Sequence, residues 1–259
     1  MRRLLFEIAY QGSRYHGYQV QKNAVTVASV LQDAVEKVWG TRLGITGCSR
    51  TDTGVHARQY FFHMDSPLSI PPDAAVRALN VNLPGDIAVL SCREVPDDFH
   101  ARYNVCYKEY VYEIWNSPLR NPFLDKLAYW YKYPLDERLM DACAAGFIGT
   151  HDFRALCSTG SKAKPTASDG GESTTRTIYE SRVRREGDKV LFTVCGDGFL
   201  YNMVRIMAGT LLMTALGKLT PEDVPHILIS GDRSLAGITA PPDGLYLTRV
   251  SYTPYAGKK

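Results

Sequence analysis

A single carboxylate lies between two arginines in a polar stretch that covers residues 47–59. Asp52 follows Arg50 and precedes Arg58. The runs on either side, 43–46 and 60–64, are rich in β-branched and aromatic residues and predict strands. Asp52 would then lie in a tight turn in which Gly54 takes a positive φ. A guanidinium within about 4–6 Å would keep the carboxylate ionised, as a carboxylate nucleophile requires, although the same pattern is also typical of a surface ion pair.

The elements that must position this turn form an alternating series of strands and helices. Apolar residues between 27 and 38 recur at helical spacing, with Thr26 as N-cap and Gly40 as the stop. A strand over 4–10 precedes this helix, and a helix over 73–79 and a strand over 87–92 follow the turn. This order predicts an α+β unit of the split βαβ kind.

The second half of the chain begins with a clear alternation over residues 106–115, which predicts a long strand with Tyr110 and Tyr112 on one face. Unassisted, strand tyrosines are usually packing residues. We expect a helix over 135–148 closed by Gly149, a strand pair from Arg176 with its hairpin at 186–189, and a buried apolar helix over 198–217. Arg205 lies on that last helix, and a buried arginine requires a carboxylate partner.

Composition limits the function classes. Hydrophobic residues make up 45% and charged residues 22% of the 259 residues, and no apolar run approaches the length of a membrane span, so a globular protein without membrane contact is expected. Glu7 interrupts the basic and apolar amino terminus, which argues against a secretion signal and for the cytoplasm. The six cysteines show no paired spacing and predict free thiols rather than a zinc site. A net charge of +3 permits an anionic partner without requiring one.

Residues 50–57, Arg-Thr-Asp-Thr-Gly-Val-His-Ala, resemble the signature loop of the tRNA pseudouridine synthases of the TruA family. Further segments resemble those of the family in the same order along nearly the whole chain. They are Phe99-His100-Ala101-Arg102, the Lys-x-Tyr-x-Tyr pattern that contains Tyr110, Thr150-His151-Asp152-Phe153, Met203-Val204-Arg205, and 239–247. The chain departs from the family pattern at Gln11 and Tyr18, where the family has aspartate and tryptophan.

The resemblance implies a role for each of these residues. Asp52 would be the nucleophile, Tyr110 would stack on the target base, and Arg205 would pair with the aspartate. Four further residues would bind substrate near the cleft or hold the carboxylate: Arg50, Arg58, His100 and Arg102.

The resemblance also implies the architecture and the partners. The expected fold class is α+β, with two ferredoxin-like (split βαβ) halves joined around a central, mainly antiparallel sheet flanked by helices. We place the N-terminal domain at 1–102 and the C-terminal domain at 103–259. The expected substrate is the anticodon arm of tRNA, at positions 38 to 40, and the expected assembly is a homodimer. No cofactor and no metal are implied.

Several alternatives stay open at this point. A paralogous synthase with another RNA target, a non-catalytic RNA-binding protein and a nucleoside hydrolase with Asp52 as general base would use similar residues. Attack of Asp52 at C1′ and attack at C6 of the uracil are equally compatible with the sequence. We also expect a mobile loop over 158–175, on which Lys162 and Lys164 are candidate phosphate contacts or solvated surface residues.

Overall fold

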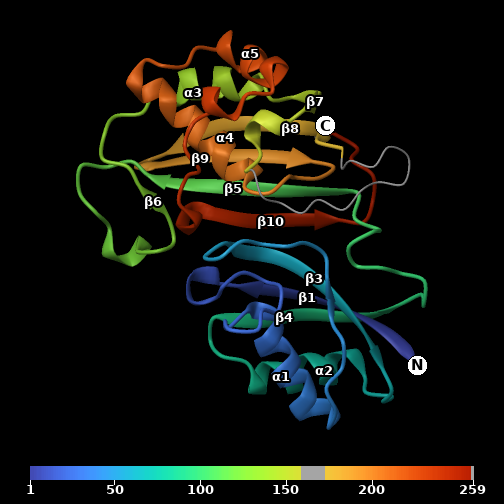
Figure 1. Cartoon of the computed structure of the whole chain (residues 1–259). Helices are drawn as coiled ribbons and strands as arrows, with labels where there is room; N and C mark the ends of the chain where they lie inside the picture. Colours follow the sequence, from blue (N-terminus) through green and yellow to red (C-terminus); the bar gives the residue numbers. More distant parts are fainter. Residues whose placement is uncertain (159–172, 258–259) are drawn as a thin grey trace. The chain divides into compact units, whose positions relative to one another are not determined.

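The computed structural model describes residues 1–158 and 173–257, which form two compact units (Figure 1). The first unit comprises Met1–Lys108 and Tyr246–Pro254, and the second comprises Glu109–Leu245 and the described residues from Tyr255 onward. Lys162 and Lys164 lie outside the described residues. The predicted domains, 1–102 and 103–259, are segments expected to fold independently of each other. That is a different property from compactness, so the domain boundary stays a prediction.

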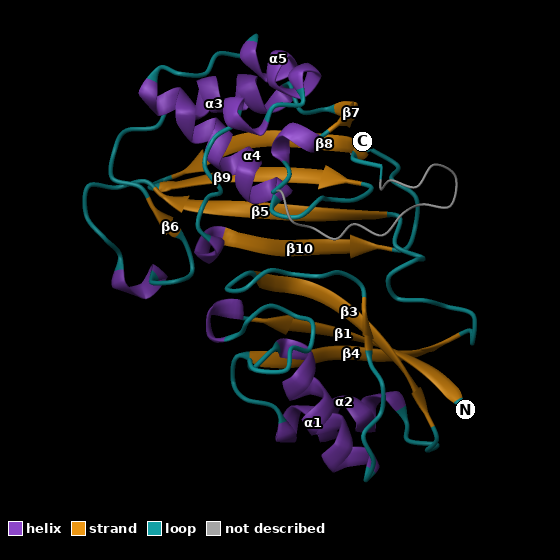
Figure 2. Cartoon of the chain, viewed as in Figure 1, coloured by secondary structure: helices purple, strands orange, loops and turns teal. Residues whose placement is uncertain are grey.

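The first unit is a sheet with two helices on one face (Figure 2). Its strands run in the order β4-β1-β3-β10, with β2 paired to β3, and only the β3–β10 pairing is parallel. Up to β4 the order βαββαβ is that of the predicted split βαβ unit. The elements are β1 (Arg2–Tyr10), α1 (Val27–Trp39), β2 (Thr46–Gly47), β3 (His56–Ser66), α2 (Pro72–Asn82), β4 (Ile87–Val95) and β10 (Leu245–Ser251).

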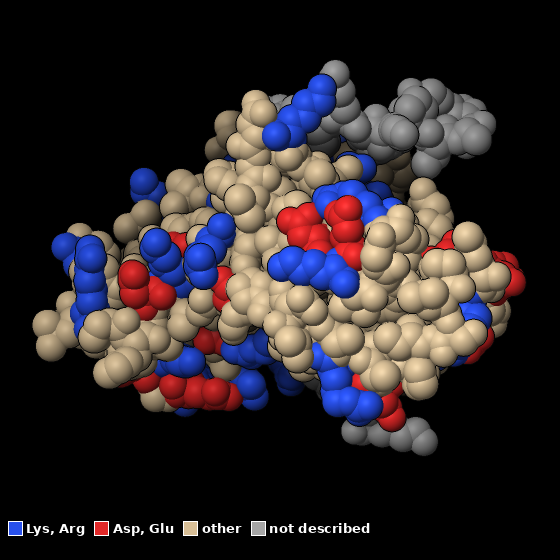
Figure 3. Space-filling view, turned by 90° about the horizontal axis from the view of Figure 1, so that it is seen from below, with Lys and Arg blue, Asp and Glu red and all other residues tan. Residues whose placement is uncertain are grey.

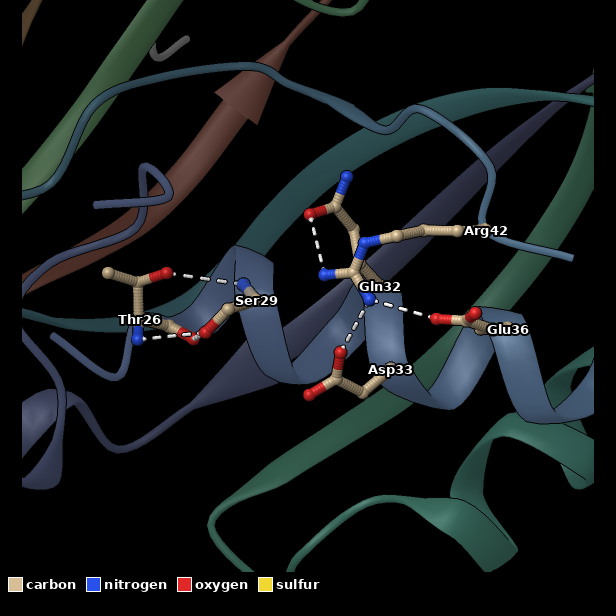
Figure 4. Close-up of polar contacts among 6 residues, drawn as sticks. All are labelled: Thr26, Ser29, Gln32, Asp33, Glu36 and Arg42. Atoms are coloured by element: carbon tan, nitrogen blue, oxygen red, sulfur yellow. Dashed lines mark hydrogen bonds and ion pairs between the residues drawn. The ribbon is translucent and has the colours of Figure 1, made fainter. Parts of the chain in front are cut away.

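Helix α1 confirms its sequence signals. The Thr26 hydroxyl accepts from the Ser29 amide, and the Ser29 hydroxyl oxygen accepts from the Thr26 amide, a reciprocal capping box (Figure 4). The helix ends at Gly40, whose φ of 70° is the left-handed conformation that glycine adopts without strain. Its apolar face packs into the core of the first unit.

The second unit has a sheet in the order β5-β9-β8-β7, with β6 paired in parallel to β5. The pairings of β7 with β8 and of β8 with β9 are antiparallel, and the hairpin between β8 and β9 lies where it was predicted, at Gly187. The elements are β5 (Tyr107–Trp115), β6 (Tyr129–Trp130), α3 (Glu137–Ala145), β7 (Gly149–Asp152), β8 (Thr175–Glu186), β9 (Lys189–Gly196), α4 (Met203–Leu211) and α5 (Asp223–Ser230). The mixed α+β class is confirmed, while two ferredoxin-like halves stay a prediction.

Several predicted boundaries were wrong, the end of the helix over 198–217 among them, since α4 ends at Leu211. The strand before the turn is reduced to β2, and β3 begins at His56 rather than at residue 60. Helix α3 ends before Gly146, because Gly149, with a φ of 119°, already belongs to β7. Helix α4 begins at Met203 rather than at residue 198, because Asn202 is left-handed with a φ of 60° and stops the helix from extending backwards.

Two features of the described residues bear on the protein class. The six cysteines are free thiols. Among the helices of residues 1–158 and 173–257, none has both the length and the apolar character that crossing a membrane requires.

The turn that carries Asp52 is fixed by the segment that follows β1. The Tyr18 amide donates to the Thr51 carbonyl at 3.2 Å, and the Gly54 amide donates to the Tyr15 carbonyl at 3.2 Å. These bonds satisfy main-chain groups on both sides of Asp52, so the turn has little freedom to change its conformation.

The contact between the turn and the segment 12–18 requires glycine at two positions of that segment. A Cβ on Gly12 would lie 1.9 Å from the Val55 carbonyl oxygen, and a Cβ on Gly17 would lie 2.5 Å from the Thr51 carbonyl oxygen. Gly17 also has a φ of 80°. The two backbones therefore touch directly, with no side chain between them.

The other anchor of the turn comes from β3. The hydroxyl of the fully buried Tyr60 donates to the Ser49 carbonyl, and the Cys48 amide donates to the Phe61 carbonyl at 2.8 Å. The Tyr18 ring stacks on Tyr60 at 4.4 Å between centroids. Strand β3 thus anchors the start of the turn through hydrogen bonds and a stacked ring.

Strands β1 and β3 also hold the segment 99–104. His63 Nδ1 accepts from the Ala101 amide at 3.1 Å, and Arg3 donates to the Phe99 carbonyl at 3.0 Å. Burial, helped by the nearby charge of Arg3, lowers the pKa of His63 to about 4. The Ala101 amide needs an unprotonated Nδ1 on His63 as its acceptor. The lowered pKa keeps the His63 ring neutral in the folded chain.

Replacing Tyr60 by phenylalanine tests the anchor of the turn. The Tyr60→Phe variant leaves the Ser49 carbonyl buried without its donor, so its free energy of unfolding should fall by about 1–3 kcal/mol. Tyr18→Phe is the matched control, because the Tyr18 hydroxyl is buried without a hydrogen-bond partner among the described residues and its removal should cost nothing. Urea denaturation of both variants measures the difference, and equal losses in the two would contradict the assigned anchor.

His63 should make stability depend on pH. Because its pKa is lower in the folded chain than the ordinary 6.5, the unfolded chain binds more protons between those values. The stabilisation is complete above pH 6.5 and is lost as the pH falls toward 4. We expect the stability difference between wild type and His63→Asn, which keeps an acceptor for Ala101, to shrink over this range in urea denaturation. A difference that is constant with pH would refute the assignment.

Candidate active site

Asp52 lies half-buried in the turn between β2 and β3, as the sequence predicted. Its carbonyl accepts from the Val55 amide at 3.2 Å, and Gly54 takes a φ of 82°. The turn is closed by its own hydrogen bond and held by the neighbouring segments. A side chain on such a turn starts from a fixed backbone, which suits a group that must meet its target atom in one geometry.

The two arginines that flank Asp52 in sequence differ in their surroundings. Arg50 is exposed and forms no hydrogen bond or ion pair with a described residue. Arg58 is exposed on β3, with its guanidinium 4.5 Å from the centre of the Tyr246 ring. This cation–π contact fixes the orientation of Arg58. The expected support of the carboxylate by either arginine stays a prediction.

A half-buried lysine and a buried histidine, neither of which we singled out from the sequence, also support the turn. Lys108 Nζ donates to Ser49 Oγ at 3.1 Å. His56, at the start of β3, accepts from the Gly12 amide through Nδ1 at 3.0 Å and stacks on Tyr246. The position of His56 within the motif 50–57 was the only signal in the sequence, and it gave no direction for the ring.

Cys48 is excluded as a nucleophile next to this turn. Burial raises the pKa of its thiol to about 11, in spite of the opposing charge of Lys108. A thiol with such a pKa is protonated at neutral pH and reacts poorly. Asp52 is therefore the better candidate nucleophile in this part of the chain.

His100 and Arg102 lie on the segment held by β3. His100 Nδ1 accepts from the amides of Arg102 and Tyr103 at 3.1 and 3.2 Å, so this nitrogen already serves the segment itself. Arg102 is exposed, and its guanidinium forms no hydrogen bond or ion pair with a described residue. His100 thus has a structural role that the sequence did not indicate, while the side chain of Arg102 has no partner in the part of the chain that is described.

Tyr110 and Tyr112 share one face of β5. Tyr110 is 6% exposed, and its ring meets Phe199 edge-on at 5.1 Å between centroids. Tyr112 is fully buried, and its hydroxyl donates to the Pro241 carbonyl at 2.7 Å, which agrees with its predicted packing role. Phe199 orients the Tyr110 ring, a contact that sequence spacing could not supply.

Arg205 is half-buried on α4, whereas we expected it to be buried. Its Nε donates to the Ala240 carbonyl at 2.7 Å, and one terminal nitrogen donates to Asn202 Oδ1 at 2.9 Å. The Ala240 amide in turn donates to the Arg205 carbonyl. Arg205 therefore ties the end of the second unit's last loop to α4 through uncharged acceptors, and its pairing with Asp52 stays a prediction.

The candidate residues divide between the two units. Asp52, Arg50, Arg58, His100 and Arg102 belong to the first unit, and Tyr110 and Arg205 belong to the second. Asp152, adjacent to His151, accepts from the Arg154 amide and guanidinium and so has a local role. Over the part of the chain that is described, no three His, Cys, Asp or Glu side chains gather as metal ligands.

Known proteins match this chain along nearly its whole length. A family model described as tRNA pseudouridine synthase matches residues 8–104 and 143–253. Proteins named tRNA pseudouridine synthase A are similar to it. The one from Thermoanaerobacter sp. (strain X514) is 43% identical over 252 residues, 97% of this chain and all of the relative. The one from Halalkalibacterium halodurans is 41% identical over 254 residues, 98% of this chain and 94% of the relative. With a family model over most of its residues and relatives of this identity, the chain belongs to the tRNA pseudouridine synthase family.

Proposed function

We propose that this protein isomerises uridine to pseudouridine in tRNA, at positions 38 to 40 of the anticodon arm, with Asp52 as the nucleophile. Family membership supports the reaction and the substrate class. The observation that carries the assignment of Asp52 is its turn, which is clamped from both sides by main-chain contacts to 12–18 and by Tyr60. Binding and catalytic residues are often carried by loops that a rigid scaffold positions, and this turn is such a loop.

The reaction needs no group from outside the RNA and the protein. The C1′–N1 bond of the uridine breaks, C1′ bonds to C5 of the same uracil, C5 loses a proton and N1 gains one. Asp52 would add covalently to C1′ or to C6 and leave again at the end. The target uridine must leave its stack before Asp52 can reach it, at a cost of a few kcal/mol that contacts to the RNA offset.

Tyr110 and Arg205 complete the proposed site from the second unit. Tyr110 would stack on the uracil, and its hydroxyl would help to remove the C5 proton. Arg205 would keep the Asp52 carboxylate ionised and directed. The rigid setting of both residues, by Phe199 and by Asn202, supports these roles.

The setting of the enzyme follows from the same proposal. A protein that modifies tRNA acts where tRNA is used, so we infer a cytoplasmic location. We also propose a homodimer, because an RNA larger than one subunit's site is readily held by a groove that two copies share.

A related synthase with a different RNA target is the second candidate. It is favoured by Tyr18, which takes the position of the family's tryptophan and packs against Tyr60 beneath the turn. Mapping of pseudouridine in the total RNA of cells that lack this protein distinguishes the two. Loss at positions 38 to 40 supports the first candidate, and loss at other sites supports the second.

Replacing the nucleophile gives the sharpest test of the chemistry. Asp52→Asn keeps the size and the hydrogen-bonding shape of the side chain but removes its nucleophilic oxygen. We expect no pseudouridine above background, with nearly unchanged affinity for tRNA. Release of tritium from tRNA labelled at C5 of uridine measures turnover, and filter binding measures affinity. Substantial turnover by this variant would rule out Asp52 as the nucleophile, and release of free uracil by the wild type would indicate a hydrolase instead.

The role of Arg205 is tested by separating its positive charge from its hydrogen bonds within the second unit. Arg205→Met removes both and should lower turnover roughly 100- to 1,000-fold, as the loss of one well-placed electrostatic group does. Asn202→Gly keeps the left-handed backbone, the guanidinium charge and its bond to Ala240, and removes the side-chain contacts of Asn202 with Arg205 and Ser158, so turnover should fall far less. Full activity of Arg205→Met would remove the proposed role. Equal losses in the two variants would assign Arg205 to the loop rather than to the chemistry.

A further inference from the structure

The first unit contains a groove of about 350 Å³ that the proposed chemistry does not use. Its walls come from the segment 18–20, from α1, from 45–50 and from the segment 100–103. A site of this volume lies at the small end of the range for ligand pockets. Arg50 is among its lining residues, but Asp52 is not among the described residues that line it.

Tyr103 presents an open aromatic face at this groove. Its side chain is 78% exposed, and one face of its ring stacks on His100 at 4.1 Å between centroids, with 25° between the ring planes. A planar base could therefore cover the other face. Single exposed aromatics are common, so exposure alone indicates nothing.

The segment that carries Tyr103 is pre-ordered. The Tyr103 amide donates to His100 Nδ1, and the His100 amide donates to Asn104 Oδ1 at 2.6 Å. From the core, His63 accepts from the Ala101 amide, and Tyr252 donates to the Ala101 carbonyl at 3.0 Å. The ring is thus presented on a fixed backbone, which lowers the entropy lost when a ligand binds.

Charge distinguishes this groove from an ordinary hollow. Arg50 and Arg102 line it and are exposed, and neither guanidinium forms a hydrogen bond or ion pair with residues 1–158 and 173–257. The described lining includes no aspartate or glutamate. On the face shown in Figure 3, lysine and arginine side chains lie among those of aspartate and glutamate.

Arg42 provides the contrast. Arg42 donates to Gln32, which lines the groove. The Arg42 guanidinium is already paired with Asp33 at 2.8 Å and with Glu36 at 2.9 Å (Figure 4). The charge of Arg42 is neutralised within the fold. The guanidinium groups of Arg50 and Arg102 have no carboxylate partner among the described residues.

We propose that this groove binds an unpaired nucleotide of the tRNA other than the reacting uridine. Its base stacks on the open face of Tyr103, and its flanking phosphates are bound by Arg50 and Arg102. Stacking on an aromatic ring beside arginines is the usual way in which proteins hold unpaired nucleotides. The inference rests on the proposed function, and it adds a subsite that grips the RNA next to the flipped uridine.

Tyr103→Ala should weaken the binding of a tRNA transcript about 5- to 150-fold, the range expected for one lost base–aromatic stack. KM should rise while kcat stays close to that of the wild type, and Tyr103→Trp should restore the affinity. Filter binding and tritium release measure these quantities, and thermal unfolding checks that the variants are folded. Wild-type affinity in a folded Tyr103→Ala variant would overturn the subsite.

The contact itself is identified by a double-mutant cycle across the interface. Single abasic nucleotides are placed in turn through the unpaired regions of the transcript, and binding is measured with wild type and with Tyr103→Ala. At one position the missing base should weaken wild-type binding but leave Tyr103→Ala unaffected. If both proteins respond alike at every position, Tyr103 acts on folding rather than on the RNA, and the proposal fails.

The arginines are tested by salt dependence. Arg102→Gln should reduce the slope of log affinity against log salt by about one phosphate contact, 0.7 to 0.9. Arg42→Gln is the matched control and should leave affinity and slope unchanged; a slope change equal to that of Arg102→Gln would overturn the phosphate contact. A wild type that forms no pseudouridine would refute the proposed function, whereas an active wild type with indifferent Tyr103 and Arg102 would refute the subsite alone.

Discussion

The direct contact between two stretches of backbone determines where the candidate nucleophile lies. The segment 12–18 touches the turn 51–55 at Gly12 and Gly17, so closely that a methyl group at either position would collide with a carbonyl oxygen. Close-packed interiors transmit such constraints because little room remains for adjustment. The backbone position of Asp52 is thus fixed by main-chain packing.

The sequence predicted those elements whose ends carry their own chemistry. Helix α1 has a capping box at Thr26 and a left-handed glycine at its end, and both boundaries were correct. The boundaries of α3 and α4 depend instead on backbone conformations that composition does not encode. Asn202 adopts a positive φ, and its side-chain oxygen accepts from the Arg205 guanidinium. The apolar residues before Asn202 had the pattern of one more helical turn. Tertiary contacts decide such cases.

The site was predictable to the extent that a motif is contiguous. Residues 50–57 indicated the turn and its carboxylate, because glycine and short polar residues favour that conformation locally. The use of His100 Nδ1 within its own segment was not visible, since a histidine in sequence carries no orientation. Tyr103 received no attention for a similar reason. Exposure on one face and stacking on the other are properties of a folded surface, and no spacing rule reports them.

The distribution of paired and unpaired arginines separates structure from binding in the first unit. Arg3 and Arg42 have carboxylates at 2.7 to 2.9 Å, so a phosphate could engage them only by competing with a partner that is always present. Arg50 and Arg102 face no such competition among the described residues, and they extend from backbone that is already ordered. An RNA phosphate that reaches them displaces only water and counterions. Binding of a nucleotide in the groove that they line therefore breaks no existing ion pair of these arginines and needs little rearrangement of the protein.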